Sequence, residues 1–207
     1  MSRPVDVSQP KGVNDEYVQQ GVSENWNKEL KVDLCDGRSV PRSSVGDVQG
    51  TFGPDWNLRW LIIPPRAITD QGIHKLEPYR ETLLYLDVSD ASITDDAVEF
   101  LKSFSSLRGL SLRRTKITSQ ALNSFRDFPS LVMLNLSGTQ VKGKDIIRLC
   151  ECPKLTRLIL NDLPITDEDV TRLMDLPLTE LGLERTRLSS KKIEEFRTTK
   201  PNCLIHY

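Results

Sequence analysis

The sequence predicts a single α/β solenoid over residues 58–207, because one composite pattern recurs there about every 24 residues. Each copy opens on a leucine, and apolar residues follow three and five positions later, the alternation of a half-buried strand. Ten positions after the opening leucine comes Ile, Val or Leu, and then a short run with apolar residues at helical spacing. The six opening residues are Leu58, Leu83, Leu107, Leu131, Leu155 and Leu178.

The copy that begins at Leu155 shows the unit most clearly. It reads LTRLILNDLPITDEDVTRLMDLP: a strand pattern, a polar turn, an Ile-Thr-Asp segment and a short amphipathic run. A threonine ahead of such a run can accept helix amides, and acids in the first turn suit the positive end of the helix dipole. A proline cannot continue a helix, so it ends each run. The capping threonines are Thr94, Thr118 and Thr166, and the closing prolines are Pro129, Pro153, Pro177 and Pro201.

Stacking explains why the unit is repeated. One strand and one helix cannot bury their own apolar faces, whereas stacked copies form continuous leucine ladders and parallel strands. Positions three and five of each copy then point away from the core and line a candidate partner-binding surface. We expect that surface to contain Trp60, Tyr85, Asp87, Met133, Asn135 and Arg157. Tyr85→Ala or Arg157→Ala should weaken binding without changing the melting temperature. For Trp60, coverage by the preceding segment is an equal alternative.

The residues before the repeats divide into two parts. Residues 1–14 are polar and predict a flexible N-terminal arm. Residues 15–57 predict an N-terminal cap, in preference to an independent domain, because they contain too few apolar residues for a separate core. Within them we expect a helix over 15–30, a strand over 30–34 and a loop over 38–56. At the other end, the residues after Pro201 predict a final edge strand.

The register LxxLxLxx[T]xI, with Thr115, Thr139 and Thr186 at its ninth position, resembles the leucine-rich repeat family. The Ile-Thr-Asp continuation is similar to the bacterial 24-residue variety, and also to the repeats of F-box receptor subunits. The resemblance implies a right-handed solenoid with strands on the concave face and helices on the convex face, and it implies protein–protein interaction. The departures are Arg66, Ala91 and Leu163 at the ninth position and Val141-Lys-Gly143 in place of Ile-Thr-Asp.

Composition excludes several classes of function. The net charge is −1 and basic residues are interleaved with acids, which argues against a nucleic-acid or anionic-membrane partner. The first residues form no apolar leader and no apolar run reaches the length of a membrane span. We therefore expect a cytoplasmic protein, although a chain trimmed of its leader would look the same.

Catalytic patterns are absent from the sequence. The two histidines, His74 and His206, have no Ser or Cys at a recognisable spacing, and no Gly-rich phosphate loop is present. Cys150-Glu-Cys152 is at best a metal half-site; the alternative, which we favour, is that Cys152 is a small core residue. We expect no enzyme activity, no cofactor, no metal and no small-molecule substrate.

The sequence therefore favours a non-catalytic protein-binding scaffold with a protein partner. The alternative is an adaptor or receptor subunit that recruits a target to a larger enzyme, for which residues 15–30 are the sole candidate docking helix. A targeting fragment of an enzyme and an exported sugar-recognising protein are less well supported.

Overall fold

The computed structural model describes residues 49–52, 58–152 and 154–207. The described residues contain all six predicted copies of the repeat apart from Pro153. The expected arm over 1–14, the helix over 15–30, the strand over 30–34 and Cys35 lie outside the described residues.

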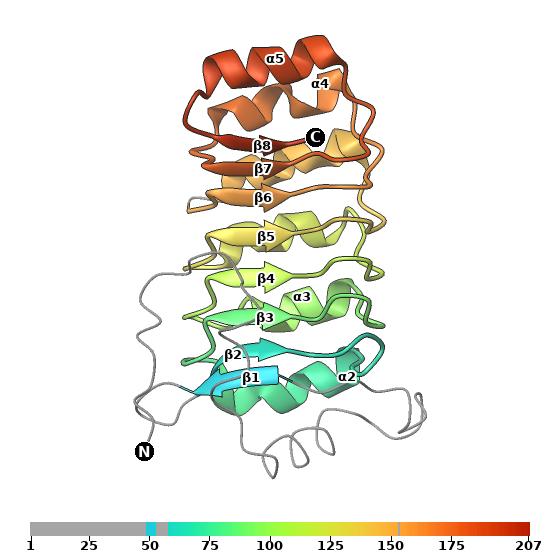
Figure 1. The fold of residues 1–207 in the computed structure, drawn as a ribbon. Helices are drawn as coiled ribbons and strands as arrows, with labels where there is room; N and C mark the ends of the chain where they lie inside the picture. The colour runs from blue at the N-terminus through green and yellow to red at the C-terminus, as the bar shows by residue number, and fades with distance from the viewer. Residues whose placement is uncertain (1–48, 53–57, 153) are drawn as a thin grey trace.

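One sheet of eight strands runs the length of the molecule, and its strands follow in chain order (Figure 1). The strands from β2 onward pair in parallel, and β1 (Gln49–Phe52) pairs antiparallel with β2. The parallel strands are β2 (Leu58–Ile62), β3 (Tyr85–Asp87), β4 (Gly109–Ser111), β5 (Met133–Asn135), β6 (Arg157–Ile159), β7 (Glu180–Gly182) and β8 (Leu204–His206). The predicted α/β solenoid is confirmed.

The described helices lie along one side of this sheet (Figure 1). They are α2 (Asp70–Ile73), η3 (His74–Tyr79), α3 (Asp95–Leu101), η4 (Ala121–Asp127), η5 (Gly143–Glu151), α4 (Asp167–Val170), η6 (Thr171–Asp175) and α5 (Ser190–Thr199). Four of them, named η, are 3₁₀ helices rather than the α-helices that the spacing suggests. Strands repeat every ~4.8 Å, whereas α-helices are ~10 Å wide, so the tighter 3₁₀ form suits the stack.

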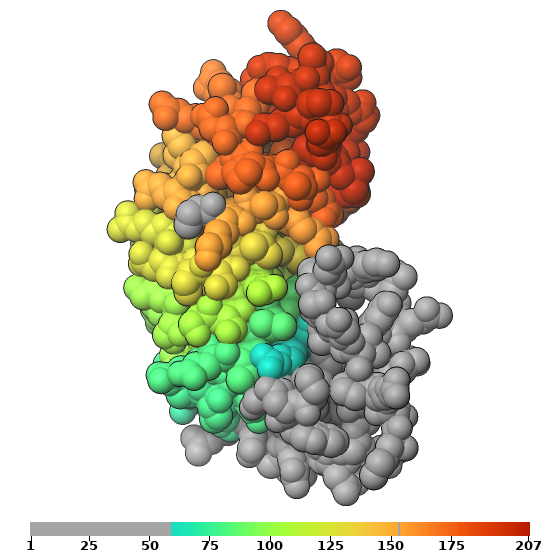
Figure 2. Space-filling view, turned by 90° about the vertical axis from the view of Figure 1, so that its left-hand side faces the viewer, coloured from blue at the N-terminus to red at the C-terminus, as the bar shows by residue number. Residues whose placement is uncertain are grey.

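The leucine ladders form as the period predicts. Leu61, Leu86, Leu110, Leu134, Leu158 and Leu181 are paired strand to strand and are 0% exposed. Figure 2 shows the copies succeeding one another along the long axis in the order of the chain. Because each copy packs on its neighbours, the core is one continuous cluster from Leu61 to Phe196.

Two local features differ from the sequence interpretation. Strand β1 lies within 38–56, where we expected only loop; it pairs along β2, whose outer edge would otherwise leave backbone groups unpaired. Arg66, assigned to the ninth position, instead occupies the preceding left-handed turn, with φ of 60° as in Asp90 at 59°. Ala67 is then buried in the first copy, as Ala91 is in the second. The shift arises because the Pro64-Pro65 segment contains one more residue before the left-handed turn than the second copy does.

The Ile-Thr-Asp segments link neighbouring copies. The carboxylate of Asp70 accepts hydrogen bonds from the backbone N–H and hydroxyl of Thr94, both at 2.8 Å. Asp95 binds Thr118 in the same way. Asp167 binds the N–H and hydroxyl of Ser189, which holds the pKa of this carboxyl below its usual range. These acids, assigned from sequence to helix starts, therefore also join one copy to the next.

Candidate functional site

The side of the sheet opposite the helices, here called the strand face, carries two columns of side chains. The register aligns position three of every copy in one column and position five in the other, as the sequence predicts. The first column is Trp60, Tyr85, Gly109, Met133, Arg157, Glu180 and Leu204. The second is Ile62, Asp87, Ser111, Asn135, Ile159, Gly182 and His206.

An aromatic pair occupies the N-terminal part of the first column. The rings of Trp60 and Tyr85 stack with centroids 4.5 Å apart. The Tyr85 ring lies over Gly109, where a Cβ would clash with its Cδ2 and come within 3.0 Å of its Cε2. Tyr85 is consequently only 7% exposed, and burial, reinforced by the charge of Asp87, raises the pKa of its hydroxyl. Tyr85 thus contributes to the floor of the strand face.

Asp87 and Asn135 are half-exposed, but part of each side chain is already bound within the chain. The Oδ1 atom of Asp87 accepts the backbone N–H of Ser89 at 2.8 Å, and Oδ1 of Asn135 accepts that of Ser137 at 3.0 Å. These are Asx-type turns that end the strands. The second oxygen of Asp87 and the amide nitrogen of Asn135 make no hydrogen bond with a described residue.

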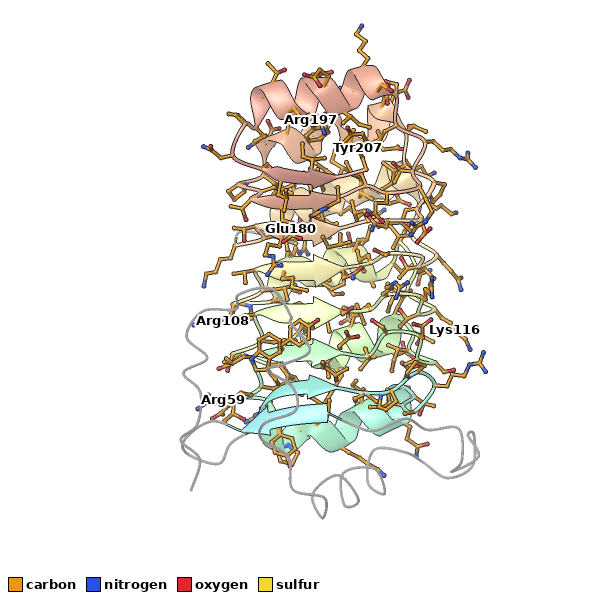
Figure 3. The ribbon with its side chains drawn as sticks, viewed as in Figure 1. Arg59, Arg108, Lys116, Glu180, Arg197 and Tyr207 are labelled. Carbon is orange, nitrogen blue, oxygen red and sulfur yellow. The ribbon has the colours of Figure 1, made fainter. Side chains whose placement is uncertain are left out.

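A charged group occupies the C-terminal part of the strand face. Arg157 Nε donates to Glu180 Oε2 at 2.6 Å, and Glu180 Oε1 lies 3.5 Å from His206 Nε2. Their side chains are 29%, 22% and 42% exposed, so the group remains open to solvent. Figure 3 shows Glu180 on the sheet toward the C-terminal end of the stack. Neither His206 nor Glu180 is among the site residues predicted from sequence; the β7–β8 register is the signal that brings them together.

The turns at the end of the strands form a flank of alternating charge. The residues there with left-handed backbone are Arg66, Asp90, Arg114, Gly138, Asp162 and Arg185. Arg114 lies 3.7 Å from Asp90, and Arg185 forms a bidentate pair with Asp162. Hydrogen bonds from Arg185 hold the pKa of Asp162 below its usual range. Lys116 lies at this edge, and Arg59 and Arg108 lie at the opposite edge (Figure 3).

The remaining candidate residues do not assemble a reactive site. His74 is exposed on the helix side and packs on Phe100, with ring centroids 4.2 Å apart. Cys152 is 3% exposed, as expected of a core residue, and burial raises its pKa to about 12. Within the described ranges, no group of three or more His, Cys, Asp or Glu side chains is placed to hold a metal ion. Every helix in these ranges is too short or too polar to span a bilayer.

Comparison with known proteins agrees with this geometry. Residues 81–141 match the family model described as leucine rich repeat. No curated protein matches the sequence. Among solved structures, internalin C2 of Listeria monocytogenes is similar over 72% of this chain and 70% of its own, at 20% identity and a TM-score of 0.51.

Two other structures are also similar. An internalin (inlF) of the same organism aligns over 60% of this chain at 19% identity, with a TM-score of 0.45. A leucine-rich repeat protein of Leptospira interrogans aligns over 64% of this chain at 22% identity, with a TM-score of 0.45. This chain spans 41% and 39% of those two proteins. The family match over residues 81–141 and the fold shared with internalin C2 agree with the register found along the whole stack, and the chain folds as a leucine-rich repeat solenoid.

Proposed function

We propose that the chain is a non-catalytic protein-binding scaffold and that the strand face is its binding surface. The observation that carries this proposal is the content of the first column. Trp60 and Met133 are half-exposed, Arg157 is charged and 29% exposed, and Leu204 is 58% exposed. The leucine ladders that hold the copies together do not require these residue types on the strand face. Tryptophan, methionine and arginine are enriched in protein interfaces, and tryptophan and arginine are among the residues that carry most of the binding energy there.

The rigidity of the stack supports the same function. Each strand is paired on both sides from β2 to β7, and the ladder residues beneath it are fully buried. The two columns are therefore already ordered before a partner arrives, and little conformational entropy is lost on binding. Seven parallel strands at ~4.8 Å spacing give a face about 29 Å long, close to what a standard footprint of ~800 Å² requires.

We further propose that residues 15–57 cap the N-terminal end of the stack. Strand β1 supports this because it covers the outer edge of β2 in antiparallel pairing. An open edge at that end would be a template for association with other chains.

The experiment that tests the strand face is site-specific photo-cross-linking. A benzophenone amino acid is placed at Met133 or Leu204 on the strand face, and at Asn123 or Glu194 on the helix side, which are exposed and serve as matched controls. Each protein is expressed in the native host, and cross-linked products are identified by mass spectrometry.

The proposal expects the same partner to cross-link from both strand-face positions and not from the helix side. It also expects Met133→Glu to remove the cross-link formed from Leu204. Partners that cross-link from the helix side alone, or equally from both sides, would overturn the strand face as the binding surface.

A further inference from the structure

The guanidinium of Arg157 uses only one of its five N–H donors in hydrogen bonds with the described residues. Its Nε binds Glu180, but its two terminal nitrogens make no hydrogen bond with any described residue. Arginine presents five donors in a planar fork that matches a carboxylate with two parallel bonds. Because the side chain is 29% exposed on the strand face, these terminal donors can be reached from solvent.

An apolar surface lies directly beside these donors. Met133 is the register neighbour of Arg157, and Gly109 is the next position in the column. The Tyr85 ring lies over Gly109, so an aromatic surface replaces the missing side chain there. The charge of Arg157 is felt at the Tyr85 hydroxyl, where it opposes the rise in pKa, which agrees with their proximity on this face.

Glu180 and His206, on the C-terminal side of Arg157, limit the direction from which an acidic ligand can approach. Glu180 takes the Nε side of the guanidinium and lies between Arg157 and His206. An acidic ligand approaching from the Glu180 side would meet a like charge, whereas the Met133 side carries no acid in the first column. On the N-terminal side, Asp87 is the acid of the second column, and one of its oxygens accepts the backbone N–H of Ser89.

We propose that the strand face binds a protein segment that presents the carboxylate of a Glu or Asp side chain to Arg157 and an apolar side chain to the surface formed by Met133 and Tyr85. This inference rests on the proposed function and names the chemistry of its partner. The carboxylate accepts hydrogen bonds from the two terminal nitrogens of Arg157, and the apolar side chain covers Met133.

The spacing of this surface suits an extended segment that crosses the strands. Two strand spacings, from Arg157 to Gly109, amount to ~9.6 Å. In an extended peptide, residues i and i+2 point to the same side and lie ~6.6 Å apart, and long side chains cover the difference. The partner pattern is therefore an acidic residue two positions from an aromatic or aliphatic one.

Short peptides test this pattern directly. The probe is acetyl-Glu-Gly-Phe-amide, titrated into the full-length protein labelled with ¹⁵N and with ¹³C at the methionine methyl groups. Two control peptides carry Gln in place of Glu or Gly in place of Phe. A fourth, acetyl-Gly-Gly-Phe with a free C-terminus, offers a carboxylate that is not a side chain. Signals of the Arg157 Nε–H and the Met133 methyl report binding.

We expect the first peptide to shift both signals and to bind about tenfold more tightly than the Gln peptide, because one charge-assisted contact is lost. Arg157→Gln should abolish this preference, and Arg157→Lys should retain part of it. Arg126→Gln, an exposed arginine of the helix side that pairs with Glu151, is the matched control and should change nothing.

Equal binding of the Glu and Gln peptides, or no shift at about 10 mM peptide, would overturn the inference. Equally tight binding of the free C-terminal carboxylate would overturn the assignment to an acidic side chain. The cross-linking experiment separates the two proposals: if cross-links still form from Met133 and Leu204, the strand face binds a partner of different chemistry.

Discussion

The carboxylate of Asp169 occupies the space that a side chain at position 143 would need, and Gly143 leaves that space open. A Cβ on Gly143 would overlap Asp169 Oδ2 and lie 2.8 Å from its Cγ. From there Asp169 accepts the backbone N–H and hydroxyl of Thr166, both at 2.8 Å. In other copies the aspartate of the preceding copy makes these two bonds, as Asp70 does to Thr94. The irregular Val141-Lys-Gly143 segment is thus compensated by a capping box within the next copy.

This exchange predicts a specific rescue. Asp169→Ala should lower the free energy of unfolding by about 1 kcal/mol, because Thr166 loses both bonds and α4 loses its cap. Gly143→Asp alone should also destabilise, because its side chain competes with Asp169 for one space. The double variant Gly143→Asp/Asp169→Ala should recover most of the loss. Urea unfolding of all four proteins measures the coupling.

The matched control is Glu168→Ala, an exposed acid of the same helix that bonds to no described residue. It should change stability by less than about 0.5 kcal/mol. Additive losses in the double variant would show that the two positions do not share one role.

Tyr85 is predicted to stabilise the fold as well as to form the surface. Because its ring is 7% exposed and covers Gly109, Tyr85→Ala should cost about 3 kcal/mol or more. This revises the expectation that Tyr85→Ala leaves the melting temperature unchanged. Gly109→Ala should also destabilise, because its Cβ displaces the ring. Thermal unfolding checks both, with the half-exposed Met133→Ala as the milder comparison; equal effects of Tyr85→Ala and Met133→Ala would contradict the prediction.

The contacts between copies predict acid sensitivity. Ser189 lowers the pKa of Asp167, and Arg185 lowers that of Asp162, so the folded protein binds protons there more weakly than the unfolded chain. The stabilisation that these two carboxylates give the folded protein is therefore complete above about pH 4. It is lost as the pH falls through their lowered folded-state pKa values. Urea midpoints measured between about pH 6 and pH 2 should fall less steeply in Asp167→Asn.

Asp96→Asn is the control for that titration, since the carboxylate of Asp96 bonds to no described residue. Its midpoints should follow the wild-type curve in shape. If the urea midpoint of Asp167→Asn fell with pH as steeply as that of the wild type, the bonds to Ser189 would not contribute to the pH dependence.

The cysteines are predicted to react with iodoacetamide at different rates. Burial raises the pKa of Cys152 to about 12 and also raises those of Cys150 and Cys203, which are only half-buried. At pH 8 the Cys152 thiolate is scarce and shielded, so Cys152 should be modified last of the three cysteines that the structure describes. Peptide mass spectrometry after timed alkylation measures each site. Similar rates for Cys150 and Cys152 in the folded protein would contradict this order.

Much of the fold could be predicted because it depends on residues at fixed spacing. The ladder at Leu134 follows from the period alone, and so does the place of Cys152 among core residues. The two columns of the strand face follow from strand alternation once the copies are aligned. The 3₁₀ geometry and strand β1 were missed, because both depend on how neighbouring elements crowd or complete the stack.

The candidate site was predicted less completely. The strand register aligns the predicted positions in two columns, but the state of each side chain depends on its neighbour in the next copy. The Tyr85 ring can lie over Gly109 because glycine has no side chain. Arg157 is held in place because its register neighbour on the next strand is Glu180. Such pairs lie 23 or 24 residues apart in the chain and carry no local signal.

By itself the sequence determined the repeat, the side of the sheet to which each strand residue points and the residues of the core. The reason is that the apolar side chains recur at a fixed spacing, and stacked copies are the arrangement that buries them. Only the tertiary structure decided which outward side chains are exposed and which are held by a neighbouring copy. That depends on contacts across strands ~4.8 Å apart, where a glycine, an aspartate or a glutamate in the next copy redirects the side chain beside it.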